Sequence, residues 1–178
     1  MKKTIVTFGL ISGAVSALMM VGTLPFEDKI GYDHGYVIGY TTIVLSFLLV
    51  YFGIRSYRDN VGSGQITFGR AFGIGICITV ISCLCYVLTW EILYYNFYPD
   101  FLDKFDAHVI AKLRASGATA AAIQAKAQEL QKLKEMYANP LFNGAMTFLE
   151  PFPVGLLITL ISAGILRKKA PAVDALPA

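Results

Sequence analysis

Charged residues are scarce in this sequence. Asp, Glu, Lys and Arg account for 15% of the 178 residues, and 56% of the residues are hydrophobic. A soluble domain usually has about 25% charged and about 45–50% apolar residues. The few charges are also unevenly placed, because residues 4–26, 35–54 and 71–90 contain none and residues 145–166 contain only Glu150. These gaps exclude an ordinary soluble domain.

Each of these stretches is long enough to cross a membrane as a helix, since roughly 20 apolar residues span a hydrocarbon core of about 30 Å. The first stretch continues to full spanning length, so we expect a retained helix rather than a cleaved export signal. The sequence therefore predicts an all-α integral membrane protein that is surrounded by the lipid bilayer. We expect a single membrane domain over residues 1–169, with four spans at about 4–26, 35–54, 71–95 and 145–166.

Residues that carry enzyme chemistry are sparse as well. The two histidines lie in different segments, and Cys77, Cys83 and Cys85 fall within one predicted span, where we expect them to pack as small hydrophobic groups. No motif for a nucleophile or a metal accompanies them, and the net charge of +3 is too small to indicate a nucleic-acid partner. We therefore expect no catalytic residue, no cofactor and no metal, and a protein that is not an enzyme.

The basic residues lie at alternate ends of the predicted spans. Lys and Arg next to a span are retained on the cytoplasmic side of a membrane. They occur before the first span, between the second and third, and after the fourth, as Lys2, Lys3, Arg55, Arg58, Arg70, Arg167, Lys168 and Lys169. The loop after the first span is acidic instead, since Glu27, Asp28 and Asp33 outnumber Lys29. This distribution predicts that both termini are cytoplasmic.

The segment between the third and fourth spans has the composition of a soluble protein. Residues 100–139 are rich in the helix-forming residues Ala, Lys, Gln and Glu, interrupted at Ser116-Gly117 and ended by Asn139-Pro140. The pattern predicts an extracytoplasmic helical hairpin. Its apolar stripes allow two interpretations: a solvated hairpin that packs against itself, or a docking element for a protein partner. We expect the Pro- and Ala-rich tail, 170–178, to be disordered.

Several motifs resemble one bacterial family of membrane proteins. They are ITFGRAFGIGI at residues 66–76, the hairpin rich in Ala, Lys and Glu, and PFPVGLLITLISAGILRKK at residues 151–169. The sequence is similar to the family catalogued as domain of unknown function 4199. The resemblance covers nearly the whole chain, implies the inner membrane of a Gram-negative bacterium, and supplies no catalytic residue.

The fourth predicted span carries a carboxyl group and two prolines near its start. Residues 152–166 alone would cover only about 22 Å as a helix, so Glu150 lies inside the outer edge of the membrane, where a carboxyl group is costly unless it is neutral, paired or facing a wet cavity. Pro151 and Pro153 lack backbone N–H groups, so they predict a kink in the helix or form its first turn. We expect Glu150 to be neutral or hydrogen-bonded and to lie against the third span in the outer third of the bundle, with Glu91 and Tyr94 at a compatible depth. A proton shared by Glu150 and Glu91 is one hypothesis.

Glycines recur four residues apart in three of the predicted spans. Small residues at this spacing let helix backbones approach closely in lipid. We predict helix packing at these glycines within one bundle, or alternatively a homo-oligomer face. The pairs are Gly9 and Gly13, Gly35 and Gly39, and Gly69 and Gly73.

Two functions fit these observations. The first is a non-catalytic inner-membrane protein whose periplasmic hairpin docks a partner or stabilises a complex. The second is a small transporter or channel component that uses Glu150 and Glu91. The hydroxyl groups of Thr79, Ser82 and Thr159 can bond within their own helices, so we do not expect them to mark a pathway. The sequence favours docking.

Overall fold

The structure is a computed structural model that describes residues 1–168. The tail 170–178, which was predicted to be disordered, lies outside the described residues. The described chain is all helical and contains no strand. Its elements are α1 (Lys2–Thr23), the short 3-10 helix η1 (Leu24–Phe26), α2 (Glu27–Ile30), α3 (Tyr32–Asn60), α4 (Phe68–Asn96), α5 (Phe101–Ala115), α6 (Ala120–Tyr137), α7 (Pro140–Leu149) and α8 (Phe152–Leu166).

Four helical segments are long and apolar enough to cross a membrane, which is typical of a multi-pass membrane protein. Three are continuous, whereas the fourth consists of α7 followed by α8. The segments are Lys2–Phe26, His34–Asn60, Phe68–Asn96 and Pro140–Leu166.

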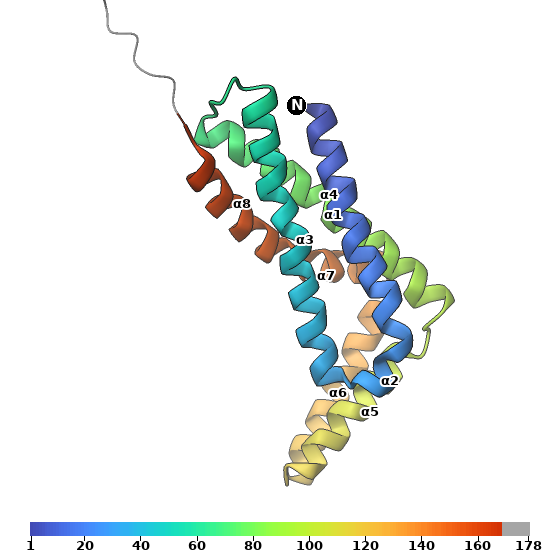
Figure 1. The fold of residues 1–178 in the computed structure, drawn as a ribbon. Coiled ribbons are helices and arrows are strands. Elements are labelled where there is room, and N and C mark those ends of the chain that lie inside the picture. Colours follow the sequence, from blue (N-terminus) through green and yellow to red (C-terminus); the bar gives the residue numbers. More distant parts are fainter. Residues whose placement is uncertain (169–178) are drawn as a thin grey trace, which may run out of the picture.

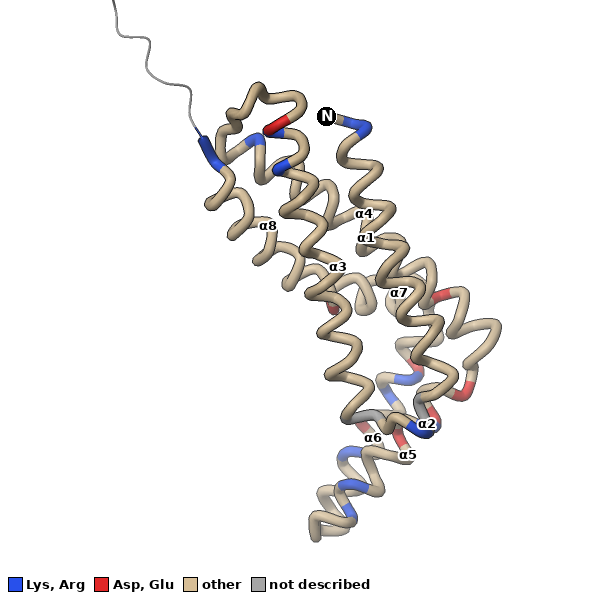
Figure 2. Tube along the Cα trace, in the orientation of Figure 1, with Lys and Arg blue, Asp and Glu red and all other residues tan. Residues whose placement is uncertain are grey.

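Helix α4 is the centre of the bundle, because α1, α3, α7 and α8 all pack against it. Figure 1 shows α1, α3 and α4 side by side, with α8 crossing at the end that carries the N-terminus and with α5 and α6 projecting from the other end. Figure 2 shows Lys and Arg residues at the N-terminus, near the turn between α3 and α4, and after α8. We call this the basic end of the bundle and the other the α5–α6 end.

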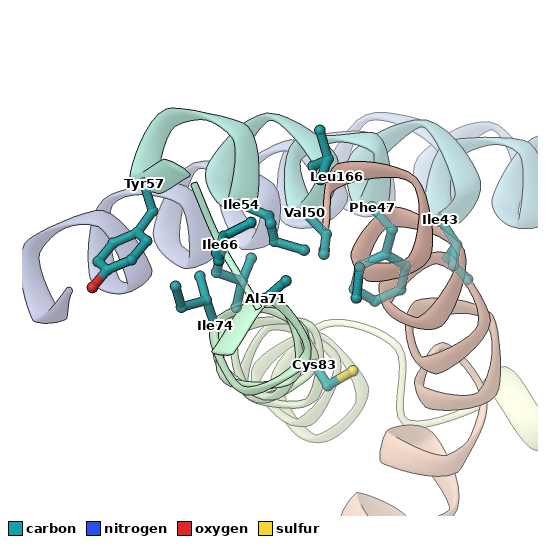
Figure 3. Close-up of a cluster of buried hydrophobic side chains, with 12 residues drawn as sticks. Ile43, Phe47, Val50, Ile54, Tyr57, Ile66, Ala71, Ile74, Cys83 and Leu166 are labelled. Carbon is teal, nitrogen blue, oxygen red and sulfur yellow. The ribbon is translucent and has the colours of Figure 1, made fainter. Parts of the chain in front are cut away.

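The hydrophobic core lies toward the basic end. Side chains from α3, α4 and α8 meet there, and Figure 3 shows Phe47, Val50, Ile54 and Ile74 pointing into the same space. The turn before α4 closes this end, because Ile66 and Lys168 exchange two backbone hydrogen bonds of 3.0 and 2.9 Å. The basic end is therefore well packed.

Glycine contacts bring α1 close to α4. A Cβ atom on Gly9 would lie 2.8 Å from Ile81, and one on Gly13 would lie 2.5 Å from Cys85. Atoms cannot approach so closely without a shift, so both positions need a residue without a side chain. Gly9 and Gly13 thus lie at a helix contact of the kind that their spacing indicates.

The other two predicted pairs do not lie at such contacts. A Cβ atom on Gly35, Gly39, Gly69 or Gly73 would meet no neighbouring atom within 4 Å. The prediction that these four glycines lie at helix contacts within the bundle is therefore wrong. Gly35 and Gly39 line a cavity instead, and α8 packs on a different face of α4 from the one that carries Gly69 and Gly73.

Serine hydroxyl groups join α1, α3 and α4 near the middle of the bundle. Ser12 Oγ donates to the backbone carbonyl of Ser46 over 2.9 Å and lies 3.0 Å from Ser82 Oγ. Ser16 Oγ donates to Ser46 Oγ over 2.9 Å. All four side chains are buried. Hydroxyl groups of this kind hold helices together where lipid supplies no hydrophobic drive for their association.

The contact between α8 and α4 combines a glycine with two threonines. Thr79 Oγ1 and Thr159 Oγ1 lie 3.0 Å apart, and Thr79 Oγ1 donates to the carbonyl of Gly155. A Cβ atom on Gly155 would lie 2.4 Å from Thr79 and 2.9 Å from Phe47. From the sequence, Thr79, Ser82 and Thr159 were seen as hydroxyl groups that can bond within their own helices. They bond between helices instead, because close backbone approach puts the hydroxyl groups within reach of one another.

The close fit at Gly155 yields a stability prediction. Gly155→Ala forces Thr79 or Phe47 to move, so we expect a loss of about 1–3 kcal/mol in the free energy of unfolding, as for other overpacked sites. Gly164→Ala is the matched control on α8, since a Cβ atom there meets nothing within 4 Å. Thermal unfolding in detergent, followed by circular dichroism, measures both. An unchanged melting temperature for Gly155→Ala would contradict this packing.

Candidate functional site

The fourth spanning segment is broken at Glu150-Pro151. Helix α7 ends at Leu149 and α8 begins at Phe152. Pro151 and Pro153 have no backbone N–H, so the carbonyl groups four residues before them receive no helical hydrogen bond from these positions. The two prolines lie at the break, where their chemistry indicated a kink. A freed backbone at membrane depth needs shelter within protein or a water-filled cavity.

Glu150 lies at this break and against α4. Tyr86 Oη donates a hydrogen bond of 3.2 Å to Glu150 Oε2. The two residues have similar depths, because Tyr86 follows Arg70 by 16 residues and Glu150 precedes Arg167 by 17, each about 25 Å along a helix. Glu150 is exposed as a whole residue. Its carboxyl group is therefore hydrogen-bonded at one oxygen without being enclosed.

A cavity of about 600 Å³ adjoins this pair. Helices α1, α3, α4 and α7 form its walls, and α5 and α6 cover it at the α5–α6 end. Apart from Glu150 and the aromatic residues, the lining of the cavity is mostly aliphatic, with a few threonine hydroxyl groups. The aromatic residues that line the cavity are Tyr36, Tyr40, Tyr86, Trp90, Phe101, Phe105 and Tyr137.

The lining of the cavity carries a negative group but no positive one. Glu150 is the only Asp, Glu, Lys, Arg or His among the described residues that line it. Tyr86 is the one hydrogen-bond partner that the described chain supplies to this carboxyl group. The arrangement can therefore offer a carboxylate, tyrosine hydroxyl groups and aromatic faces to a bound molecule, but no positive charge.

Trp90 fixes the wall between α4, α5 and α7. Its Nε1 donates to Asn143 Oδ1 over 2.9 Å, and its ring meets Phe101 edge to face at 5.0 Å. Thr147 Oγ1 donates to the same Asn143 oxygen over 3.2 Å. Asn143 is fully buried. Tyr86, Trp90 and Asn143 were not among the predicted site residues; a lone tryptophan and an amide inside an apolar run were the available signals.

Glu91 and Tyr94, the other predicted site residues, lie outside this cavity. Glu91 Oε1 is buried without a hydrogen-bond partner in the described chain and lies near Gly144 of α7. Tyr94 is buried, with its ring 5.6 Å from that of Trp90. No hydrogen bond joins Glu91 to Glu150 in the described residues. The hypothesis of a shared proton is therefore not supported.

Helix geometry explains this correction. Tyr86 and Glu91 are five residues apart, which turns their side chains by about 140° around α4. Glu150 faces Tyr86, whereas Glu91 faces Gly144 of α7. Glu91 lies at a depth along α4 that would allow contact with Glu150, but its side chain points toward a different neighbour.

The helix pair α5–α6 turns apolar residues toward the bundle. Leu102 and Leu130 are buried, while Phe105 and Leu133 line the cavity. At the base of the pair, Tyr95 Oη donates to the backbone carbonyl of Tyr137 over 3.2 Å.

An ion pair clamps the two helices to each other. Lys134, near the end of α6, pairs with Asp103, near the start of α5. The hydrogen bond to Asp103 raises the pKa of Lys134 above its usual value. The helix pair α5–α6 thus contacts the bundle through apolar residues, and an exposed ion pair joins the two helices.

Comparisons with known proteins identify a family without assigning an activity. No cluster of three or more His, Cys, Asp or Glu that could hold a metal occurs among residues 1–168. No curated protein and no solved structure matches the chain. The model of the family described as "Protein of unknown function (DUF4199)" matches residues 7–168, so the chain belongs to the DUF4199 family.

Proposed function

We propose that this protein is a non-catalytic, multi-pass protein of the bacterial inner membrane that binds a small molecule in the cavity beside Glu150. The basic end and both termini face the cytoplasm in this proposal, and α5–α6 forms a periplasmic helical hairpin. The orientation is supported by the Lys and Arg residues at the basic end, because such residues resist translocation.

The single observation that carries the proposal is a roomy cavity with one carboxyl group at a helix break. Ligand pockets measure about 300–1,000 Å³ and are mostly apolar with a few placed polar groups, which fits a cavity of about 600 Å³. Ionisable residues within spanning segments usually mark functional sites. Many transporters also build their binding sites at broken helices within the membrane. Binding as part of a carrier is thus the function that the geometry supports best.

Docking through the hairpin receives less support than the sequence suggested. A docking surface would need large apolar residues on the outside of α5 and α6. Met136 is the only large hydrophobic residue exposed in those two helices. The large apolar residues of the two helices are instead buried, as Leu102 and Leu130 are, or line the cavity, as Phe105 and Leu133 do. The hairpin is better suited to cap the cavity than to bind a partner protein.

The proposed orientation predicts the outcome of reporter fusions. A periplasm-dependent phosphatase inserted at Gly117, in the turn of the helix pair, should be active, because this turn would lie outside the cytoplasm. The same phosphatase inserted at Gly64, in the turn between α3 and α4, should be inactive. The reverse pattern would show that the molecule is inserted the other way round.

The proposed binding site predicts a difference between two glycine variants. Gly39 lines the cavity and leaves open space around it, so the side chain of Gly39→Leu should occupy part of the cavity without disturbing the fold. Gly73→Leu is the matched control, because it also enters open space but lies outside the cavity. We expect native mass spectrometry in mild detergent to find a small molecule bound to the wild type and Gly73→Leu, and at least about tenfold less on Gly39→Leu.

Two results would contradict the proposed site. One is a wild-type protein that retains no small molecule under any mild detergent tested. The other is equal retention by Gly39→Leu and the wild type. Equal melting temperatures for the two leucine variants are the control for folding.

A further inference from the structure

We infer that the cavity binds an organic cation with an apolar body, with the positive group held at Glu150 among tyrosine rings. The inference rests on the proposed function, because it names the ligand class of the same cavity. It follows from three properties of the site: a carboxyl group without a positively charged partner, the aromatic character of the lining, and the absence of Lys, Arg and His from the described lining residues.

The carboxyl group lacks a positive partner. A carboxyl group at membrane depth is costly unless it is neutral, paired or facing water, and an ionised one is stabilised by a positive partner. No Lys, Arg or His lines the cavity within the described chain, and Tyr86 supplies one neutral hydrogen bond to Glu150 Oε2. Glu150 itself lines the cavity, so a positive group bound there could pair with the carboxylate. A cationic ligand would complete this pair.

The aromatic lining is suited to the same ligand. A cation over the face of Trp or Tyr is attracted by the ring quadrupole, and cages of such rings recognise substituted ammonium groups. Tyr36, Tyr40, Tyr86, Trp90 and Tyr137 line the cavity together with Glu150. Methionine and leucine side chains complete the lining and would contact the apolar body of the ligand. Carboxylate and rings thus favour the same charge.

The lining also disfavours the other ligand classes. An anion such as a fatty acid or a phosphate would face Glu150 with no basic residue to compensate it. A neutral ligand would leave the carboxylate without a positively charged partner.

The ammonium group could belong to a soluble molecule or to a lipid headgroup. A headgroup such as phosphatidylethanolamine brings its phosphate within a few ångströms of the amine, so the site favours the soluble source.

Two probes of equal shape and opposite charge test the inference. Tetraphenylphosphonium and tetraphenylborate are added to the protein in phosphatidylglycerol nanodiscs, and binding to empty nanodiscs is subtracted. Trp90 is the only tryptophan of the chain and lines the cavity, so its emission reports occupancy. We expect saturable binding of the phosphonium, at least about tenfold tighter than any binding of the borate.

Two isosteric variants locate the charge that is responsible. Glu150→Gln keeps a hydrogen-bond acceptor for Tyr86 but loses the charge, and we expect it to weaken phosphonium binding at least about tenfold. Glu91→Gln removes the other carboxyl group at similar depth, which lies outside the cavity, and should bind as the wild type does. Melting temperatures within a few degrees of the wild type serve as the control for folding.

Phosphatidylethanolamine nanodiscs distinguish the two sources of the ammonium group. If the headgroup occupies the site, the phosphonium affinity falls there and the difference between wild type and Glu150→Gln shrinks; we expect neither. Whether the ammonium group comes from a lipid headgroup or from a soluble molecule, a cation binds at Glu150.

Equal binding of both probes, or full phosphonium affinity in Glu150→Gln, would overturn the inference. If Gly39→Leu still abolished binding in that case, the cavity would remain a binding site for another ligand class. Failure of both probes, together with the absence of any retained small molecule, would overturn the proposed function as well.

Discussion

The contact between Gly155 and Thr79 determines how the last spanning segment lies on the bundle. Because Gly155 has no side chain, α8 approaches α4 closely enough for Thr79 and Thr159 to share a hydrogen bond. The contact fixes the register of α8, and the five residues that precede Gly155 then carry the chain to the break at Glu150. Tyr86, seven residues after Thr79 on α4, lies at the matching depth and meets the carboxyl group.

Among the described residues, no equally close glycine contact occurs toward the α5–α6 end of the bundle, and the cavity lies at that end. Near the basic end, Gly9 and Gly13 seat α1 on α4, and the serine hydroxyl groups tie α3 to both. Toward the α5–α6 end, Gly35 and Gly39 of α3 meet no neighbouring helix. The space between α3 and its neighbours is closed by α5 and α6 instead of by direct helix packing. A closely packed half of the bundle therefore adjoins an open half.

The sequence was most informative where a single physical rule decides the outcome. Stretches without charge predicted four membrane-length helices, since a charge in hydrocarbon is expensive, and Pro151 and Pro153 located the break because they lack N–H groups. Spacing was a weaker guide. Gly9 and Gly13 lie at a contact, whereas Gly35 and Gly39 do not, and Gly75 and Gly155 make close contacts that the pattern did not single out. Which face of a helix meets a neighbour depends on tertiary packing, and local spacing does not contain it. For the same reason, depth selected Glu91 and Tyr94 as partners of Glu150, while rotation around α4 selected Tyr86.

An experimental structure of the protein in lipid nanodiscs would show directly whether the cavity beside Glu150 binds a ligand between the helices. We expect density for a bound molecule within contact distance of Glu150 and Tyr86, enclosed by α5 and α6. A structure in which α3 closes onto α7 and fills this space with protein side chains would contradict this expectation.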